Sequence, residues 1–228
     1  MCTAREIYSL LKNEYPKLND EEFIAYYVCN RTKDLFKTLV ATILSQNSTD
    51  KSAMIAYKNL ENNIGIDPDL LSKAKMEDII DSIRICGLSN SKARYIKNVA
   101  DIFRGSRIDF SDCNQLKEFL LSIEGIGNKT ADVVLVTCLG CKAFPVDTHI
   151  RRVITRLGIV GESPRYQDIS EYFINHLDKH ELLELHHLLI THGRRVCKAR
   201  KPLCNICVLK SCCEFYVKMV EPTGSQTS

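Results

Sequence analysis

LLSIEGIGNKTADVVLVTCLG, residues 120–140, is the stretch that decides the fold. An apolar helical pattern ends at Gly125, and a four-residue turn from Gly125 to Asn128 leads straight into a second helical pattern. Gly125 and Gly127 flank one apolar residue, so the backbone can turn tightly and come close to a ligand. The N–H groups of the turn and of the following helix start then point outward together, where phosphate oxygens bind well. This helix–hairpin–helix pattern favours a DNA backbone as ligand over a tight helical corner with none.

Nearly every other segment also has a helical pattern. In residues 32–45, TKDLFKTLVATILS, the apolar residues form one broad helical stripe. Start signals recur along the chain: Asp67 before Pro68, Ser111, Ser163 before Pro164, and a capping box of Asp178 with Glu181. No alternating strand pattern occurs in the sequence. The sequence therefore predicts an all-α fold.

Two residues carry candidate chemistry, one within the hairpin stretch and one after it. Lys129 lies in the first turn of the second helix, where the positive end of the helix dipole favours the uncharged amine. Such a lysine can act as a Schiff-base nucleophile, although a simple phosphate contact stays equally open from this segment. Asp147 precedes an amphipathic helix, which is the usual place of an N-cap. A carboxylate returned to the same cleft as Lys129 can also take up a proton and stabilise a cationic transition state.

A cysteine-rich segment lies near the C-terminus. CKARKPLCNICVLKSCC, residues 197–213, holds five of the eleven cysteines. Residues 1–20 have no secretion signal, and no apolar run approaches the ~20 residues of a membrane span. We therefore expect an intracellular protein whose thiols stay reduced, which weakens the disulfide interpretation. Zinc and an iron–sulfur cluster both remain open from the spacing alone.

Charge is informative through its placement. The net charge of +3 is too small to indicate a polyanionic partner, and a composition of 45% hydrophobic and 26% charged residues is ordinary for a globular protein. Between Arg194 and Lys210, however, six residues are basic and none is acidic. A localised basic patch is typical of phosphate binding, and a solvated charged face is the simpler alternative.

Four motifs in a fixed order carry a resemblance to a known family. They are GIGNKTA (125–131), VDTHI (146–150), HHLLITHGRRVC (186–197) and the Cys-x6-Cys-x2-Cys-x5-Cys spacing that starts at Cys197. Together they resemble endonuclease III, a DNA glycosylase and AP lyase of the helix–hairpin–helix superfamily with a [4Fe–4S] cluster. The resemblance runs in register from about Phe23 to Tyr216.

The resemblance implies roles for individual residues. Lys129 matches the Schiff-base lysine of the family, and Asp147 matches its catalytic aspartate. The cluster ligands would be Cys197, Cys204, Cys207 and Cys213, which leaves Cys212 as a spare thiol. The loop after Cys197 would present positive charge to DNA through Lys198, Arg200 and Lys201.

The resemblance also implies how the duplex is opened. CGLSNSKA, residues 86–93, is similar to the wedge loop of the family, with Leu88 as the inserted apolar residue. The polar side chain that fills the gap opposite the lesion lies in LSQNSTD, residues 44–50. The family has glutamine three positions before the aspartate, whereas here Asn47 holds that position and Gln46 precedes it. Either side chain can fill the gap.

By similarity, the fold is two helical lobes. Residues 28–141 would form a helical barrel that ends in the hairpin. Residues 1–27 with 142–216 would form the lobe with the cluster, and residues 217–228 a disordered tail. His186, His187 and His192 crowd one helix without metal-pair spacing, so we expect core positions or phosphate contacts for them. Cys29, Cys86, Cys113, Cys138 and Cys141 are expected as small buried side chains.

The resulting functional hypothesis is a bifunctional glycosylase and AP lyase that removes oxidised pyrimidines from DNA through a lysine Schiff base. Its partner would be double-stranded DNA with damaged bases or abasic sites; no membrane is involved and a monomer is expected. The compartment would be the cytoplasm of a prokaryote, or the nucleus or mitochondrion of a eukaryote. Alternatives are a uracil or thymine mismatch glycosylase and an adenine glycosylase of the same fold, both disfavoured by Lys129. A non-catalytic DNA-binding or electron-transfer protein with the cluster is the alternative from another class.

Overall fold

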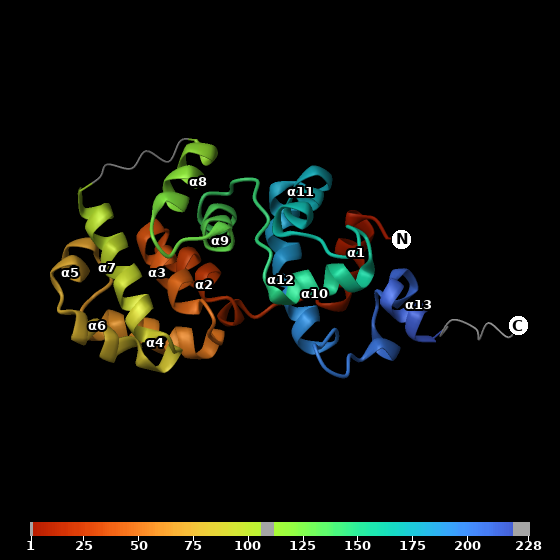
Figure 1. Ribbon diagram of the computed structural model, residues 1–228, viewed down its shortest axis with the longest axis horizontal. Coiled ribbons are helices and arrows are strands. Elements are labelled where there is room, and N and C mark those ends of the chain that lie inside the picture. The colour runs from red at the N-terminus through yellow and green to blue at the C-terminus, as the bar shows by residue number, and fades with distance from the viewer. Residues whose placement is uncertain (1, 106–111, 221–228) are drawn as a thin grey trace, which may run out of the picture. The chain divides into compact units, whose positions relative to one another are not determined.

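A computed structural model describes residues 2–105 and 112–220, and every regular element in these ranges is a helix (Figure 1). The predicted all-α fold is therefore confirmed. Contacts between residues divide the chain into two compact units. We call residues 19–141 the hairpin unit, and residues 1–18 with 142–228 the terminal unit. None of the helices within the described ranges is long and apolar enough to cross a membrane.

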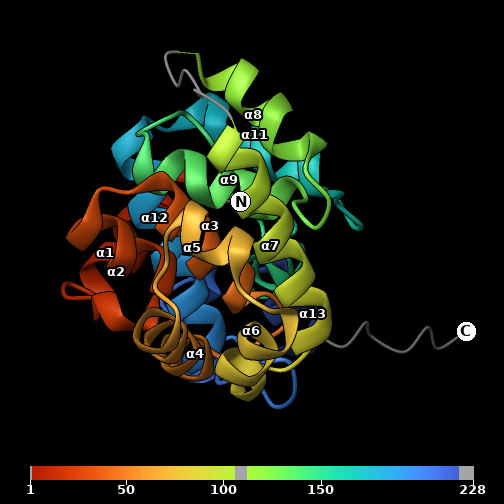
Figure 2. The ribbon, with the colours of Figure 1, turned by 90° about the vertical axis from the view of Figure 1, so that its left-hand side faces the viewer.

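The hairpin unit is built around one fully buried helix, α3. Eight residues of α3 are buried: Phe36 and the unbroken run from Thr38 to Leu44. Around it pack α2, α4, α7 and α9 (Figure 2). The elements of this unit are η1 Asp20–Glu22, α2 Ile24–Thr32, α3 Leu35–Ser45, α4 Asp50–Asn63, α5 Pro68–Lys73, α6 Met76–Ile83, η2 Arg84–Cys86, α7 Ser89–Gly105, α8 Cys113–Ser122 and α9 Asn128–Cys138, where η marks a short 3-10 turn.

The terminal unit pairs both ends of the chain. Helix α1 packs on α12, and α12 packs on α10, which also contacts α13. Phe144 and Phe173 are fully buried and stack with ring centroids 4.6 Å apart. The elements of this unit are α1 Ala4–Glu14, α10 Thr148–Leu157, α11 Tyr166–His176, α12 Lys179–Arg195, η3 Cys204–Ile206, η4 Lys210–Cys212 and α13 Glu214–Val220.

Two of the predicted helix start signals are confirmed. Asp67 caps α5 with Pro68 in its first turn, and Asp178 with Glu181 forms the capping box of α12. The helix expected after Ser163 begins later, at Tyr166, with Arg165 as its cap. Ser111 lies outside the described residues.

Two predicted boundaries differ from the observed ones. Residues 19–27, expected in the lobe with the chain ends, group with the hairpin unit because α2 begins at Ile24 and packs against α3 and α9. Residues 217–220, expected in a disordered tail, continue helix α13. The rest of that tail, residues 221–228, lies outside the described residues.

The expectation that the thiols stay reduced is wrong for six cysteines, although Cys29 and Cys141 are buried as expected. The structure has the disulfides Cys2–Cys212, Cys29–Cys138 and Cys113–Cys141. Sequence reasoning missed them because the partners lie 210, 109 and 28 residues apart in the chain. Only Cys86 keeps the predicted role of a buried free thiol outside the cysteine-rich segment. Since disulfides are typical of oxidising compartments but also of intracellular proteins from hyperthermophiles, they leave the compartment open.

The Cys113–Cys141 bond closes a loop around the hairpin, from the first residue of α8 to just beyond the end of α9. Chain-entropy arguments give a loop of this length about 3 to 4 kcal/mol of stabilisation. We predict that Cys113→Ser lowers the free energy of unfolding by about that amount when measured by denaturant titration without reductant. The control is Cys86→Ser, which removes a free thiol. Equal stability of the two variants, together with alkylation of all cysteines before reduction, would contradict the pairing.

Candidate functional site

The hairpin turn depends on one glycine. Gly125 has a φ of +88°, a conformation that side chains with a Cβ rarely adopt. A Cβ on Gly125 would also lie only 2.3 Å from Cγ of Tyr95 on α7. Gly125 is therefore required both by the backbone angle and by the space that the Tyr95 ring occupies.

Polar contacts hold the turn against the rest of its unit. Nε2 of Gln46, at the end of α3, donates to the carbonyl oxygen of Gly125 and to Oγ1 of Thr130, both at 3.0 Å. Arg94 of α7 forms an ion pair with Glu124 at 2.8 Å. The structure thus brings Gln46 to the hairpin, while Asn47 beside it is exposed.

Helix α9 starts at this turn and is anchored by its buried face. Residues 130–136 are all buried, and the fully buried Asp132 is paired with Nζ of Lys117 at 2.7 Å. Gly127 is the N-cap and provides no side chain to cap the first turn. The first-turn N–H groups of α9 are therefore available to an outside acceptor such as a phosphate oxygen. Lys129, half-buried, lies in this same turn.

Two loops of the hairpin unit carry the other predicted DNA contacts. Asn47 follows α3 and has a φ of +50°; Leu88 follows Gly87 and has a φ of +51°. Leu88 is 60% exposed and is among the most exposed large apolar side chains of the described residues. Each of these loops therefore presents an exposed side chain from a left-handed backbone position.

Asp147 belongs to the terminal unit and is the N-cap of α10, as its position predicts. Its Oδ1 accepts a hydrogen bond of 2.7 Å from the backbone N–H of Ile150, and the side chain is half-buried. Two residues on, burial lowers the pKa of His149, although the carboxylate of Asp147 opposes this shift. Nδ1 of His149 lies 3.1 Å from Nη2 of Arg152; since arginine can only donate, this nitrogen acts as acceptor and His149 is neutral.

Arginines of α10 tie this helix to the cysteine-rich segment. Arg152 donates from Nε to the Cys197 carbonyl at 2.9 Å and from Nη2 to the Gly193 carbonyl at 2.8 Å. One turn later, Arg156 donates from Nη1 to Sγ of Cys197 at 3.3 Å. The helix capped by Asp147 is thereby fixed to the first of the predicted cluster ligands.

The four predicted ligands surround one pocket. The residues that line it include Cys197, Cys204, Cys207 and Cys213. Burial raises the pKa of the Cys207 thiol to about 11, and it also raises the pKa of the Cys213 thiol. In the part of the chain that the structure describes, no three His, Cys, Asp or Glu side chains are arranged to hold a single metal ion.

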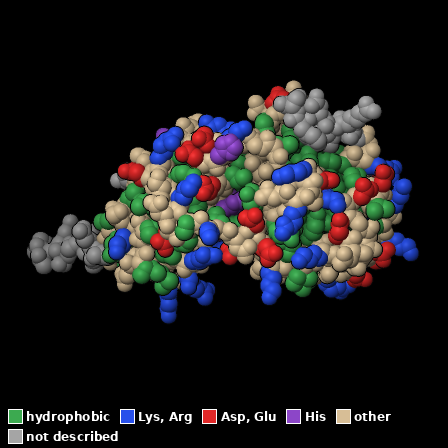
Figure 3. All heavy atoms as spheres, turned by 180° about the vertical axis from the view of Figure 1, so that it is seen from behind, with side chains coloured by type: hydrophobic (Ala, Val, Ile, Leu, Met, Phe, Trp, Pro, Cys, Tyr) green, Lys and Arg blue, Asp and Glu red, His purple; other side chains and the backbone are tan. Residues whose placement is uncertain are grey.

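The basic loop between Cys197 and Cys204 is held by its backbone and exposes its charges. Arg156 donates to the carbonyls of Lys198 and Ala199 at 2.7 and 3.1 Å, so the backbone of this loop is anchored to α10. The side chains of Lys198, Arg200 and Lys201 are exposed. Figure 3 shows basic and acidic side chains interspersed over the face that it draws, in keeping with the small net charge.

The histidines of α12 are core residues, which is one of the two roles expected for them. His186, His187 and His192 are all buried. His192 lies between the Tyr15 hydroxyl, 3.1 Å from Nδ1, and Sγ of Cys207, 3.4 Å from Nε2. Burial lowers the pKa of His192 to about 4, so it is a neutral packing and hydrogen-bonding group.

Sequence reasoning did not indicate the contacts of Lys92, Tyr95 and Arg156. For Lys92 a signal was available, because position 92 falls on the same helical stripe as the buried Ile96 and Val99. A lysine on an apolar stripe indicates a buried charge with specific partners. Tyr95 and Arg156 carry no comparable local signal.

Comparisons with known proteins agree with one another. Residues 40–178 match the family model described as HhH-GPD superfamily base excision DNA repair protein. The chain is 53% identical to the endonuclease III of Sulfolobus acidocaldarius over 97% of this chain and 100% of that protein. Two solved structures superpose with TM-scores of 0.80 and 0.81 at 28% and 26% identity, covering 97% and 96% of this chain and 100% of each of theirs. They are a non-covalent endonuclease III–DNA complex and a trapped endonuclease III–DNA covalent intermediate.

The two hairpin glycines allow a matched test. We predict that Gly125→Ala lowers the free energy of unfolding by roughly 2 to 5 kcal/mol, from backbone strain and the clash with Tyr95. In Gly127→Ala the new Cβ meets nothing within 4 Å and φ is −97°, so stability should fall by less than about 1 kcal/mol. If phosphate approaches this turn closely, Gly127→Ala nevertheless weakens duplex binding in a fluorescence-anisotropy titration. Unchanged affinity would show that the backbone of the turn does not bind DNA.

Proposed function

The chain belongs to the HhH-GPD superfamily of base excision DNA repair proteins, and from this premise we propose that it is a bifunctional DNA glycosylase and AP lyase. Its substrate is double-stranded DNA with a damaged base, in the first place an oxidised pyrimidine, or with an abasic site. The enzyme removes the base and then cleaves the strand.

The observation that carries this proposal is the position of Lys129. It lies in the first turn of α9, directly after a glycine turn, beside backbone N–H groups that have no side-chain cap. The same turn can therefore bind phosphate oxygens while an amine stands beside the sugar. An uncharged amine is the nucleophile of a Schiff-base reaction.

The reaction begins with extrusion of the damaged nucleotide, which costs roughly a few kcal/mol and least for a poorly paired base. Nζ of Lys129 then attacks C1′, the bond from C1′ to the base breaks, and the base leaves. The C1′–O4′ bond then breaks, O4′ takes up a proton, and the opened sugar is left as a cationic imine that withdraws electrons from C2′. Loss of a C2′ proton expels the 3′ phosphate, which breaks the strand by β-elimination.

Asp147 has two compatible roles in this scheme. Its Oδ1 caps α10, and a carboxylate has acceptor capacity beyond one hydrogen bond. We assign the remaining capacity to proton transfer and to stabilisation of the cationic transition state. Asparagine at this position would keep the cap but could not take up a proton.

The gap left by the extruded nucleotide is filled from the two exposed loops. Leu88 is assigned as the apolar wedge because it is exposed and lies on a left-handed turn. Asn47 is assigned as the polar side chain opposite the lesion, because Gln46 is engaged with the hairpin through both of its hydrogen bonds. Lys198, Arg200 and Lys201 contact phosphates through their exposed charges.

The cysteine pocket fits a [4Fe–4S] cluster. Four cysteines line it, and in such a cluster each of four thiolates binds a different iron. Zinc would need all four sulfurs at about 2.3 Å from one point. When bound by Cys197, Cys204, Cys207 and Cys213, the cluster would cross-link the ends of the basic loop. No catalytic step requires it.

The chemistry is tested by borohydride trapping on a duplex with one abasic site. We predict that the wild-type protein forms a covalent adduct and that Lys129→Ala forms none, while its melting temperature is unchanged. A monofunctional mismatch glycosylase or a binding module would give no adduct even as the wild type.

Asp147→Asn separates chemistry from capping. We predict that it keeps duplex affinity and stability, since asparagine is as good an N-cap as aspartate, and slows single-turnover cleavage by ~100-fold or more. Asp147→Ala, which also removes the cap, is the control and should lose about 1 kcal/mol of stability. Equal loss of affinity and turnover in Asp147→Asn would mark the residue as structural alone.

Cofactor content is checked on the purified protein. We predict a brown preparation with broad absorption near ~400 nm and four irons per chain, as thiolate-ligated clusters give. Cys207→Ser should lose most of this absorption. Cys86→Ser, which removes a free thiol outside the pocket, should keep it. A colourless protein that contains zinc would reject the assignment.

A further inference from the structure

Lys92 is a charged residue in the core of the hairpin unit. It lies in the first turns of α7 and is 1% exposed. Its Nζ donates to the carbonyl oxygen of Leu44 at 2.8 Å and to that of Cys86 at 2.9 Å. One ammonium group therefore binds the end of α3 and the end of η2 at a single point.

The two segments that it joins are those that carry the gap-filling residues. Asn47 follows Leu44 by three positions, and Leu88 follows Cys86 by two. Both have left-handed backbone angles, with φ of +50° and +51°. Such angles are unfavourable for residues other than glycine and persist only where the surrounding structure holds them.

A buried ammonium is not the most stabilising choice for this space. Burial lowers the pKa of Lys92, which reports the cost of keeping a charge out of water. A methionine has nearly the same shape and would fill the space without that cost. It could not, however, bind two carbonyl groups from separate segments, because that requires a group with several donors.

We propose that Lys92 is a positioning residue for duplex opening. It fixes the loops of Asn47 and Leu88 relative to each other, so that the wedge and the gap-filling side chain enter the base stack together. The inference rests on the proposed function, and it adds a residue that touches neither DNA nor the reacting atoms.

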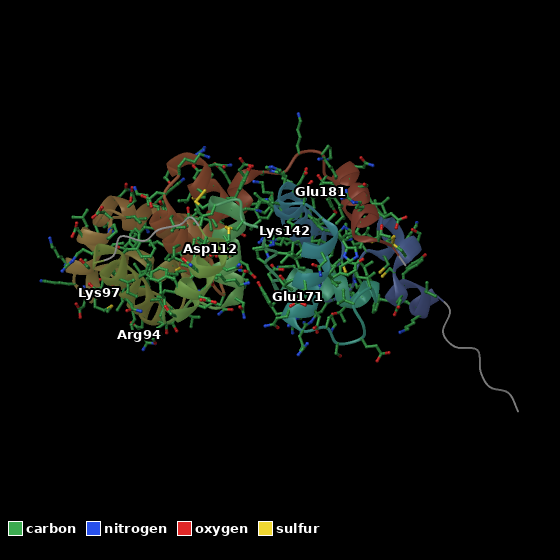
Figure 4. All side chains as sticks on the ribbon, turned by 90° about the horizontal axis from the view of Figure 1, so that it is seen from above. Arg94, Lys97, Asp112, Lys142, Glu171 and Glu181 are labelled. Atoms are coloured by element: carbon green, nitrogen blue, oxygen red, sulfur yellow. A yellow bond between two sulfur atoms is a disulfide. The ribbon has the colours of Figure 1, made fainter. Side chains whose placement is uncertain are left out.

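A second lysine of the same helix provides a control. Nζ of Lys97 also donates to two carbonyl groups, those of Ser72 and Ala74, at 2.7 and 2.6 Å. Lys97, labelled in Figure 4, thereby ties α7 to the end of α5 and not to the loops that carry Asn47 and Leu88. Lys97 makes the same kind of contact as Lys92 but does not hold the loops of Asn47 and Leu88. Replacing it therefore shows the effect of losing such a contact on the fold alone.

The test compares a substrate whose abasic nucleotide must be extruded from a duplex with one in which no duplex has to be opened. Wild type, Lys92→Met and Lys97→Met are assayed under single-turnover conditions on an abasic site in duplex DNA and in single-stranded DNA. A duplex with 2-aminopurine beside the site reports unstacking by its fluorescence. We expect Lys92→Met to lose roughly tenfold or more of its rate on the duplex, with a smaller fluorescence rise, and to stay within about twofold of wild type on the single strand.

The outcomes are distinguishable. A selective duplex loss in Lys92→Met but not in Lys97→Met supports the proposal. Equal loss on both substrates, no loss on either, or the same selective loss in Lys97→Met overturns it. A wild-type protein that cleaves neither substrate would instead refute the proposed function.

A second variant covers poor folding. Lys92→Gln keeps a polar group with N–H donors but cannot span both carbonyls as the ammonium does, and it should show a duplex-selective loss in the same direction. Leu88→Ala should show that loss too, and adding Lys92→Met to it should cost less than Lys92→Met costs in the wild type, because part of the effect of Lys92 acts through the loop of Leu88. If neither Lys92 variant folds, the residue is structural and the proposal is overturned.

Discussion

The turn at Gly125 is the constraint on which the hairpin unit depends. Its left-handed angle, the Tyr95 ring in the space where a Cβ would lie, and the Gln46 amide on its carbonyl together fix the start of α9. The buried face of α9 then leaves the first turn, with Lys129, as the part that reaches solvent and ligand. The position of Lys129 is thus fixed by contacts within the hairpin unit.

Helices α7 and α10 have the same organising role in their respective units. Helix α7 contacts the hairpin through Tyr95, and through Lys92 it binds the carbonyl groups of Leu44 and Cys86. Helix α10 carries Asp147 at its start and, through Arg152 and Arg156, binds the backbone of the cysteine-rich segment. In both cases one rigid helix fixes several irregular segments by hydrogen bonds to their carbonyl groups, which is how exposed loops acquire a defined geometry.

Much of this could be predicted from sequence because it is local. The helical periodicity around Leu39, the glycine turn and the Asp147 cap each depend on residues within a few positions of one another, and the structure has all three. The disulfides, the contact of Gln46 with Gly125 and the contact of Lys92 with Leu44 depend on residues 28 to 210 positions apart. Such pairs are decided by tertiary packing, so no periodicity or cap signal indicates them. The expectation that the thiols stay reduced also weighed against disulfides.

The central claim is that one amine, that of Lys129, forms the covalent bond to the sugar. It is tested most directly by peptide mapping of the borohydride-reduced adduct with mass spectrometry. The account predicts a single modified residue, Lys129, in the peptide that follows the hairpin turn. Modification of another lysine or of the N-terminal amine as the principal site would contradict it.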